Sequence, residues 1–560
     1  MASPETAASE VPANSDLVFL PLGGAGEIGL NAYLYGIGPV DDRKWLLVDC
    51  GVSFAGEREP GIDIVLPDLD YLASERRNLL GIVLTHGHED HYGALAHLWP
   101  ELQAPVYCTP FTRHLLEGRL IEHGLKTQVP VHEIPVGGRF QIGPFDIELI
   151  NMTHSIPEPM ALAIRTPLGN LLHSGDWKLD ETPVLGAPVD QARLQALGEE
   201  GCLALMCDST NVLREGQSIS ETDVAKSLEA IISRAKYRVA VTTFASNLGR
   251  VIAIAKAADA AGRTVIAAGR SIWRMIDAGH EAGYMEGVPP ILDIDAFDDL
   301  PRANVVCICT GSQGEPRAAL SRIAQGTHNR IEFTKGDLVI FSSFNIPGNE
   351  KAVASVQNNL SRLGVEIITN NEKLVHSSGH PRRDELAMLY DWLKPKIVVP
   401  MHGEPRHLLA QANFAAQQAG AETLIAENGE MVRLAPDGPV IMDEAPSGRL
   451  HLDGKIIVPG VHGPANARRK LGYAGMVAVS LVCDKKGRLE DDPKLALFGL
   501  PQGEGEFDLE QIIIDAIERA IDAARGEKVE LAEIIRRVIR REVDMAWGKK
   551  PTVQVFIHTV

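Results

Sequence analysis

The sequence of 560 residues lacks the features that would place it in a membrane or outside the cell. It contains no run of about 18 apolar residues, which is the length that a membrane-spanning helix needs. Its first ten residues have neither the basic start nor the apolar core of a secretory signal. We therefore expect a cytoplasmic protein that has no membrane partner and that begins with a mobile tail over residues 1–16.

Cysteine is scarce, and no two cysteines have the CxxC spacing. Closed structural zinc sites usually recruit thiolates, and small secreted domains use closely spaced cysteines as a disulfide framework. Neither kind of site is expected here, and the cysteines are predicted to be reduced core residues of a cytoplasmic protein. They are Cys50, Cys108, Cys202, Cys207, Cys307, Cys309 and Cys483.

Positively charged residues are also in deficit. The chain has 54 Lys and Arg residues and 74 Asp and Glu residues, which gives a net charge of -20. Nucleic-acid-binding proteins are more often basic. The acidity does not exclude such a function, since bound metal cations and a local basic groove can override the global sign. The length is too great for one ordinary core, so two or three domains are expected.

The chain does contain a dense cluster of metal-ligand side chains, His86-x-His88-x-Asp90-His91, directly after the apolar run 81–84. In extended backbone, residues two apart point the same way, so His86 and His88 can clasp one cation. Asp90 and His91 begin a helical pattern and turn toward a second cation. Imidazole with carboxylate suits zinc or manganese. The alternative is a histidine-rich surface loop. We favour the metal site, because HxHxDH between a buried strand and a helix start is far more specific than a motif with one spacing.

Further His and Asp residues follow later strand-like runs. His154, Asp176 and Asp208 each come at the end of such a run, and Asp176 stands where it could bridge two cations. His380 closes the run 376–380, and His402 follows another apolar strand. Loops at strand ends can converge on one cleft, so this repetition indicates a layered α/β hydrolytic metal site.

Two other features lie near the start of the chain. The glycine-rich loop 23–29 is followed by a second strand and not by a helix, which argues against a dinucleotide site. Its glycines are predicted to let the backbone pass close to the metal centre. Asp49 ends a buried strand and has two interpretations: it orients a ligand histidine, or it caps a turn.

From about residue 220 the pattern changes to alternating helices and strands, which predicts a second parallel-sheet domain inserted into the first. Small polar residues after its strands, such as those in 311–315, could hold phosphate or form ordinary tight turns. The last part has the pattern of a small α/β module without a catalytic constellation. We divide the chain into a tail (1–16), a first domain (17–219 and 366–437), an insert (220–365), a linker (438–454) and a C-terminal domain (455–560).

The motif from His86 to His91, together with His154 and Asp176, resembles the ligand set of the metallo-β-lactamase fold. The triple of Asp208, His380 and His402 resembles motifs A, B and C of the β-CASP branch of that fold. With the insert and the appended domain, the chain from residue 17 to 560 resembles bacterial ribonuclease J. This resemblance implies an α/β protein: an αββα sandwich, an inserted β-CASP domain and a small C-terminal α/β domain.

The same resemblance implies roles for the site residues. His86, His88 and His154 would hold one zinc; Asp90, His91 and His402 would hold the other; Asp176 would bridge them, with Mn²⁺ or Mg²⁺ as alternatives. Asp176, Asp208 and His380 would be catalytic, and His380 would lie beside the scissile phosphate as a proton donor or as an electrostatic group. RNA contacts would come from Phe244, Ala245, Ser246, Ser312, His376, Ser377, Ser378, Gly379 and His380.

The implied activity is a zinc-dependent ribonuclease with 5′-to-3′ exonuclease and endonuclease action on single-stranded RNA, preferring 5′-monophosphate ends. It would act in rRNA processing and mRNA decay, as a homodimer or tetramer formed through the C-terminal domain. His402 favours an RNA enzyme over a DNA enzyme. Three rival functions are considered. The insert argues against a small-molecule hydrolase, and His402 argues against a DNA nuclease. The complete ligand set argues against a non-catalytic scaffold.

Overall fold

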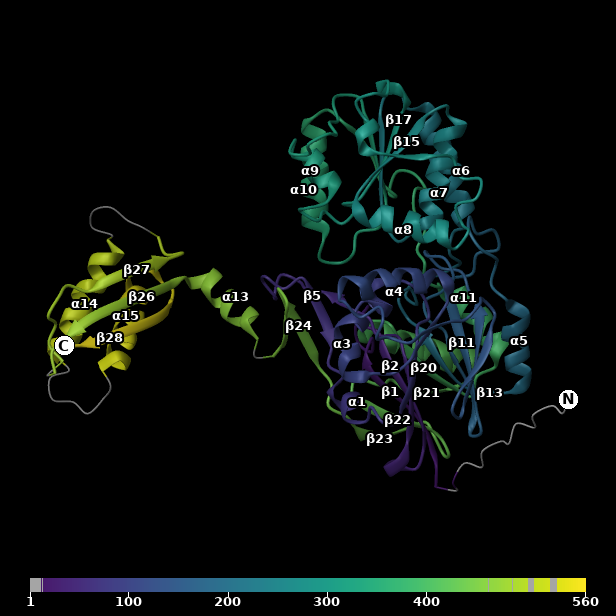
Figure 1. The fold of residues 1–560 in the computed structure, drawn as a ribbon, viewed down its shortest axis with the longest axis horizontal. Coiled ribbons are helices and arrows are strands. Elements are labelled where there is room, and N and C mark those ends of the chain that lie inside the picture. Colours follow the sequence, from purple (N-terminus) through teal and green to yellow (C-terminus); the bar gives the residue numbers. More distant parts are fainter. Residues whose placement is uncertain (1–11, 13, 462, 486, 502–507, 524–530) are drawn as a thin grey trace. The chain divides into compact units, whose positions relative to one another are not determined.

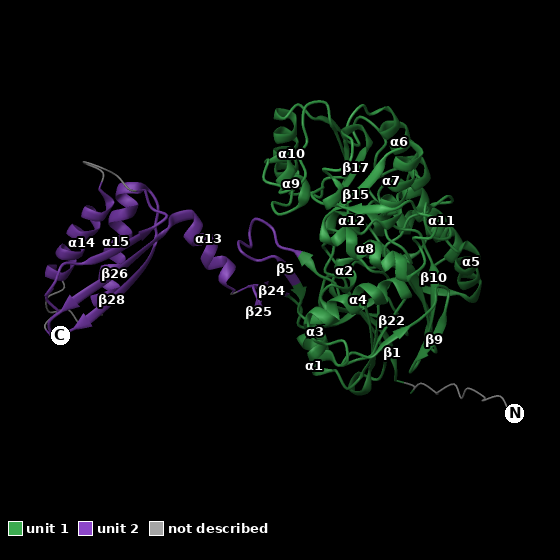
Figure 2. Ribbon diagram, turned by 45° about the horizontal axis from the view of Figure 1, so that its top comes forward, with its two compact units in different colours: residues 1–53, 66–448 green, residues 54–65, 449–560 purple. Residues whose placement is uncertain are grey.

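The computed structural model describes residues 12, 14–461, 463–485, 487–501, 508–523 and 531–560. The predicted tail 1–16 falls mostly outside the described residues. The chain forms two compact units, one made of Met1–Ser53 and Leu66–Gly448 and the other of Phe54–Val65 and Arg449–Val560 (Figure 2). Each unit is described by itself below.

The first unit contains an eight-stranded and a seven-stranded sheet (Figure 1). The eight-stranded sheet has, in spatial order, β23 (Val440–Glu444), β22 (Glu430–Ala435), β1 (Asp16–Gly23), β2 (Ala32–Gly38), β3 (Lys44–Val48), β6 (Leu79–Val83), β7 (Val106–Cys108) and β8 (Val131–Glu133). The seven-stranded sheet has β21 (Glu422–Thr423), β20 (Ile397–Met401), β13 (Cys202–Asp208), β12 (Gly169–His173), β11 (Met160–Thr166), β10 (Phe145–Asn151) and β9 (Arg139–Ile142).

The two sheets face each other across one apolar core, and helices cover their outer faces. Phe19 and Tyr35 of one sheet pack in the same buried cluster as Leu162 and Met206 of the other. Figure 1 shows α1, α3 and α4 on the side of the eight-stranded sheet and α5 and α11 on the opposite side. The αββα prediction is therefore confirmed. The helices are α1 (Asp70–Ser74), α2 (Glu89–Tyr92), α3 (Leu95–Leu102), α4 (Pro110–Glu122), α5 (Gln191–Glu200), α11 (Arg383–Leu393) and α12 (Pro405–Ala419).

Three parallel strands in the seven-stranded sheet end at the same edge. β12 pairs with β13 so that His173 lies opposite Met206, and β13 pairs with β20 so that Asp208 lies opposite Met401. Parallel strands carry their carboxyl ends to one edge of a sheet, where following loops can meet. β13 and β20 are nearly continuous apolar runs, as strands buried on both faces require. The loops after them bring the predicted site residues together.

The insert is a parallel six-stranded sheet between two groups of helices, which confirms the predicted parallel sheet. Its strands, in spatial order, are β16 (Ile291–Asp293), β15 (Thr264–Ala268), β17 (Val305–Cys309), β14 (Val239–Thr243), β18 (Leu338–Ser342) and β19 (Glu366–Ile368). Its helices are α6 (Glu221–Arg234), α7 (Leu248–Ala260), α8 (Arg270–Glu281), α9 (Ala319–Ala324) and α10 (Glu350–Arg362). Because β19 pairs with β18, the insert extends beyond the predicted end at residue 365.

A buried arginine joins the insert to the polypeptide that leaves it. Arg250 of α7 is fully buried and lies 2.6 Å from the carboxylate of Glu221, the first residue of α6. It also donates to the carbonyl of Val375 at 2.9 Å and to the hydroxyl of Ser342. Asn247 caps α7 by accepting from the backbone N–H of Arg250. One guanidinium thus connects two helices, a strand and the returning chain.

The second unit has its own apolar core beneath a three-stranded sheet of order β27-β26-β28. Its elements are β24 (Arg449–Asp453), β25 (Ile456–Pro459), α13 (Pro464–Ala474), β26 (Met476–Cys483), β27 (Lys494–Phe498), α14 (Leu509–Ala523), α15 (Leu531–Trp547) and β28 (Thr552–Thr559). Two short strands, β4 (Ser53–Phe54) and β5 (Ile64–Pro67), lie at the borders between the units.

The predicted linker over residues 438–454 is wrong in part. Residues 440–444 form β23, which pairs with β22, and residues 449–453 form β24, which pairs with β25. Most of β23 is exposed, so its polar sequence resembles a linker although its backbone belongs to a sheet. The division between the compact units falls after Gly448, inside this stretch.

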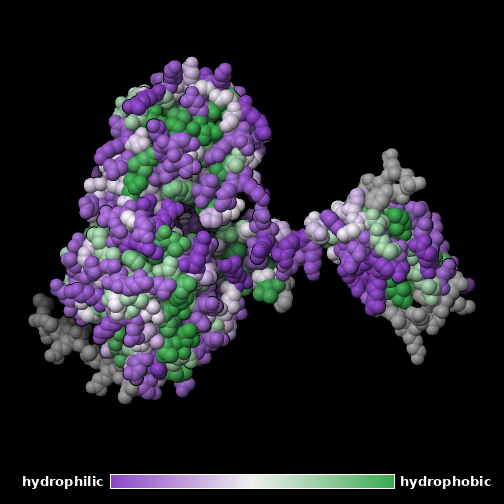
Figure 3. Space-filling model, turned by 180° about the vertical axis from the view of Figure 1, so that it is seen from behind, coloured by the Kyte–Doolittle hydropathy of each residue, from purple (hydrophilic) through white to green (hydrophobic). Residues whose placement is uncertain are grey.

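Every cysteine is free and buried, which confirms their prediction as core residues. In the part of the chain that the structure describes, no helix is long and apolar enough to cross a membrane. The face drawn in Figure 3 is mainly hydrophilic, with scattered apolar patches.

Candidate metal centre

The histidine motif lies in a tightly held loop between β6 and α2. The backbone N–H and the hydroxyl of Thr85 both donate to the carboxylate of Asp49, each at 2.8 Å. The carboxylate of Asp49 also contacts His91, whose Nδ1 lies 2.7 Å from Oδ2. Asp49 is fully buried. Of its two interpretations, the structure favours the carboxylate that orients a histidine, since it fixes the ring of His91.

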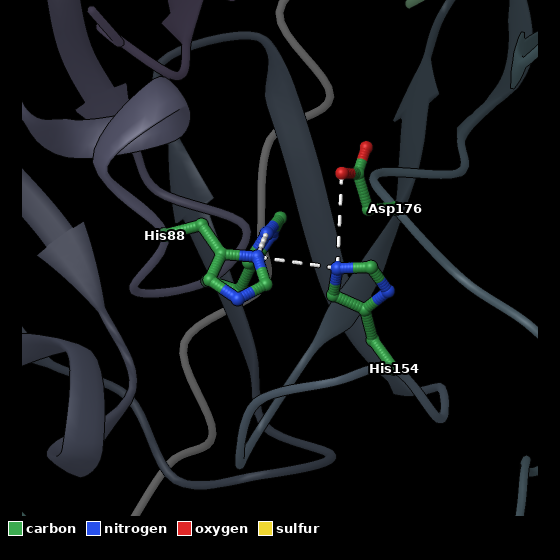
Figure 4. Close-up of side chains that lie close together, drawn as sticks. His88, His154 and Asp176 are labelled. Carbon is green, nitrogen blue, oxygen red and sulfur yellow. Dashed lines mark hydrogen bonds and ion pairs between the residues drawn. The ribbon is translucent and has the colours of Figure 1, made fainter. Parts of the chain in front are cut away.

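His86, His88, His154 and Asp176 form the first of three overlapping ligand groups, and Figure 4 labels three of its members, His88, His154 and Asp176. His88 Nδ1 lies 3.1 Å from His86 Nε2 and 3.2 Å from His154 Nε2, and His154 Nε2 lies 3.8 Å from Asp176 Oδ2. Burial lowers the pKa of His88 to about 4 and also lowers the pKa values of His86 and His154. These imidazoles are therefore neutral at pH 7 and offer lone pairs to a cation.

Asp90, His91, Asp176 and His402 form the second group. His91 Nε2 lies 3.2 Å from Asp176 Oδ2, and His402 Nε2 lies 3.4 Å from Asp90 Oδ2. Burial lowers the pKa of His402, but the charge of Asp176 and contacts with Asp208 and Asp90 raise it to about 10. The carboxylates thus favour positive charge at this place, and a divalent cation would supply it.

Asp176 belongs to both groups, and its geometry fits a metal cofactor. Within each group the ligand atoms all lie within 4.8 Å of one another. Asp176 is buried, and its Oδ1 makes no hydrogen bond to the described residues, although His402 Nδ1 lies 3.3 Å from it. A buried carboxylate oxygen without a donor is costly unless something positive lies beside it. The donor set of imidazoles and carboxylates is also that of zinc hydrolases.

The glycine-rich loop passes directly against this centre, as predicted. The carbonyl of Gly24 accepts from the backbone N–H of His402 at 2.7 Å. Gly24 has a φ of +82°, and a Cβ atom there would overlap the hydroxyl of Tyr33. Asn31, at the end of the loop, places its Nδ2 at 3.0 Å from His91 Nε2. The sequence did not identify Asn31 as a site residue.

His380 lies beside both groups, with its ring centroid 5.1 Å from that of His154 and 5.4 Å from that of His402. Its Nδ1 is 2.7 Å from Asp208 Oδ2 and 3.9 Å from Asp176 Oδ2, and its ring stacks near that of His402. A fifth of its side chain is exposed, whereas Asp208 is fully buried. Asp208, His380, Asp176 and His402 also form a third group that could hold a metal ion. The position of His380 therefore permits contact either with substrate or with a cation.

The predicted RNA-contact residues lie at two places around the centre. Phe244, Ala245 and Ser246 follow β14, and Ser312 follows β17. The run 376–380 crosses from the insert to the metal centre, where the carbonyl of Gly379 lies 2.6 Å from His154 Nδ1. Ser312 and Ser377 are buried, while Phe244 and Ser378 keep some exposed surface.

Two sets of contacts around this region were not predicted. Phe344 packs against the buried ring of His376, with ring centroids 4.8 Å apart, and the guanidinium of Arg214 lies over Phe344. Glu158 accepts from the backbone N–H of Phe111 at 2.9 Å and from the hydroxyl of Tyr284 at 3.0 Å. The loop that carries His154 is thereby attached both to α4 and to the insert.

Comparison with known proteins identifies the family. Residues 25–242 match the metallo-beta-lactamase superfamily, 236–360 the ribonuclease J beta-CASP domain, 364–426 a Zn-dependent metallo-hydrolase RNA specificity domain, and 466–560 the ribonuclease J C-terminal domain. Ribonuclease J of Sinorhizobium meliloti is 49% identical over 552 residues, covering 98% of each chain. The chain belongs to the ribonuclease J family.

Other members of the family also match most of the chain. Ribonuclease J of Mycolicibacterium smegmatis is 37% identical over 95% of each chain, and that of Thermus thermophilus is 38% identical over 82% of this chain and 81% of its own. The resemblance drawn from the motifs is confirmed, and so is the arrangement of core, insert and C-terminal domain. Family membership and the His/Asp cluster make this chain a metal-dependent ribonuclease, a hydrolytic nuclease that binds RNA.

Proposed function

We propose that the chain degrades single-stranded RNA with two zinc ions, from the 5′ end in the 5′-to-3′ direction and also by internal cuts, and that it prefers 5′-monophosphate ends. The observation that carries the proposal is the pair of His/Asp groups that share Asp176, each with its ligand atoms within 4.8 Å of one another. Mn²⁺ or Mg²⁺ are the alternative cations. The setting would be rRNA processing and mRNA decay in the cytoplasm.

In this proposal His86, His88 and His154 would hold one cation, Asp90, His91 and His402 would hold the other, and Asp176 would serve both sets. Such cations, when bound, would supply a water of lowered pKa, roughly 7, and would stabilise negative charge on the phosphate. Asp49 holds the ring of His91 through the 2.7 Å contact at Nδ1, so that Nε2 faces the centre. His91, Asp176 and His402 are buried, which strengthens their electrostatic effect.

His380 protonates or neutralises the 3′-oxygen that leaves the phosphate. Burial lowers the pKa of His380, but the nearby charge of Asp208 more than offsets this, so the pKa is raised above its ordinary value. The imidazolium is then retained to higher pH, and the side chain keeps a partly exposed edge. Cleavage on that side leaves a 5′-phosphate on the product.

End recognition would use the small polar residues near His380. Ser378 and Gly379 bring a hydroxyl and bare backbone to the crossing between insert and core, where Asn211 donates to the hydroxyl of Ser378 at 2.8 Å. A pocket fitted to a monophosphate rejects the bulkier, more highly charged triphosphate. Basic residues that could line the approach are Arg317, Arg322, Lys335, Arg382 and Arg383.

The test compares single-turnover decay of matched RNAs that carry a 5′-monophosphate, a 5′-triphosphate or a 5′-hydroxyl. Faster loss of the monophosphate RNA, with mononucleotides released from that end, is the expected result. Equal rates with internal fragments alone would leave an endonuclease and refute end recognition. Matched DNA and a chromogenic lactam serve as controls, and metal analysis of the protein measures the number and identity of the cations.

A further inference from the structure

The acidity of the chain is confined to one part of it. Residues 449–560 contain 18 Lys and Arg residues against 17 Asp and Glu residues, although the whole chain carries a net charge of -20. All of the net negative charge therefore belongs to the preceding residues. Phe54–Val65 adds one Arg against three Asp and Glu residues, so the second unit as a whole has a net charge of only -1, and a polyanion such as RNA meets little net repulsion there.

Four cations of this unit line one cavity. The cavity has a volume of about 340 Å³ and lies between the end of α13, the middle of α15 and the start of β28. Its charged lining consists of Lys470, Arg536, Arg540 and Lys550, and Tyr473 contributes an aromatic wall. Among the described residues no carboxylate lines it.

Half of these cations have no anionic partner within the described chain. Arg536 pairs with Glu533 at 2.7 Å, and Lys550 with Asp544 at 3.3 Å. Lys470 and Arg540 make no ion pair or hydrogen bond with the residues that the structure describes, and Arg540 Nε is buried without an acceptor. A buried guanidinium N–H without an acceptor calls for one from outside the chain.

An aromatic ring stands at the edge of the same cavity. Tyr473 is 70% exposed. The ammonium of Lys549 lies 4.6 Å from its ring centroid and 4.9 Å from that of Trp547, and it donates to the Tyr473 carbonyl at 3.0 Å. These contacts hold an exposed ring beside unpaired cations. Proteins that bind single-stranded nucleic acid without sequence preference combine a basic groove with rings on which bases stack.

We propose that this cavity binds the phosphodiester backbone of single-stranded RNA, with Lys470 and Arg540 on adjacent phosphates and a base stacked on Tyr473. The C-terminal unit thus provides a second, sequence-independent contact for substrates long enough to occupy both the cavity and the metal centre. The inference rests on the proposed function only in taking single-stranded RNA as the substrate.

The test measures KM and kcat of the full-length protein on single-stranded RNAs of about 5 and about 40 nucleotides, a short and a long substrate for a basic groove of this kind. Lys470→Gln/Arg540→Gln should raise KM for the long RNA about tenfold and leave the short RNA unaffected. The dependence of log KM on log salt should also become shallower by about 0.7 for each phosphate that the protein no longer neutralises. Arg541→Gln is the matched control, because Arg541 follows Arg540 on α15, is exposed and lies outside the cavity lining.

Tyr473→Ala and Tyr473→Phe test the stacked ring. Tyr473→Ala should weaken binding of the long RNA several-fold. Tyr473→Phe should bind it as the wild type does, because phenylalanine keeps the ring. Unchanged kinetics on the long RNA in all cavity variants would overturn the proposal and would leave an acidic protein segment as the occupant. If the wild-type chain cuts no RNA, the proposed function fails, but the binding site can still be tested. Fluorescence anisotropy of the labelled long RNA then compares the binding affinity of the wild type, the cavity variants and the control.

Discussion

At the scale of single residues, Asp176 and His88 show how closely the site depends on individual atoms. Asp176 contacts members of both ligand groups, and His88 Nδ1 lies within 3.2 Å of two other imidazoles. We expect His88→Ala or Asp176→Ala to abolish RNA cleavage and to lower the bound metal, because each removes a ligand that the fold cannot replace. Cleavage of labelled RNA and elemental analysis of the purified protein measure both effects.

The matched control is His132→Ala, which removes an exposed imidazole of β8 that lies outside all three ligand groups. It should keep both activity and metal. Near wild-type turnover with full metal content in His88→Ala or Asp176→Ala would contradict the assignment of ligands.

His380 is expected to act on the phosphate and not to hold a cation. His380→Ala should therefore retain its metal and show a kcat about 10²–10⁴-fold lower, the scale of a general acid or an electrostatic group. Single-turnover cleavage and metal analysis on the same preparation decide between the two roles. Loss of metal from this variant would show that His380 is a ligand of the third group with Asp208.

Asp208 should set the alkaline limit of the reaction through His380. A proton donor is active below its pKa and inactive above it, and the charge of Asp208 raises the pKa of His380 against the lowering effect of burial. Asp208→Asn removes that charge, so the pKa of His380 falls and the alkaline limb of kcat against pH should move to lower pH. An unchanged limb, or one moved upward, would mean that His380 is not the titrating donor.

At the scale of secondary-structure elements, Arg250 connects the insert to the returning chain. It is fully buried, and its partners come from α6, β18 and Val375. Arg250→Ala leaves the carboxylate of Glu221 buried without its guanidinium, which should cost about 3–5 kcal/mol of unfolding free energy. Chemical denaturation measures it. Arg234→Ala, an exposed arginine at the end of α6, should change little; an equal loss of stability in both variants would contradict the explanation.

The sequence predicted the elements whose patterns are local. The motif from His86 to His91 and the parallel strands of the insert each follow from neighbouring residues. The prediction was inaccurate at β19 and β23, because both are edge strands with much exposed surface and so lack a buried apolar run. The contact between Glu158 and Tyr284 joins residues 126 positions apart, and no local pattern indicates such a pair.

At the scale of the whole molecule, the C-terminal unit is expected to join two copies of the chain. Its helices α14 and α15 share the apolar core with one face of its sheet, while Phe498 and Phe556 remain 62% and 51% exposed. The full chain should therefore be a dimer by light scattering, or a tetramer, and a chain that ends at Gly448 should be a monomer. Phe498→Glu in the full chain should also favour the monomer. A truncated chain with the same subunit number as the full chain would contradict this role.

The position of the insert has a consequence for the order in which the chain is made. β13 and β20 are neighbouring strands in the sheet, but the insert separates them along the sequence. Asp176 precedes β13 and is synthesised before the insert, whereas His402 follows β20 and is synthesised after the insert. At roughly 5–20 residues per second, a ribosome takes on the order of 10–45 seconds to cover that separation. During that interval the emerging polypeptide lacks His380 and His402. A ribonuclease that is translated from RNA thus lacks its full set of active-site side chains until the ribosome has translated most of its own message.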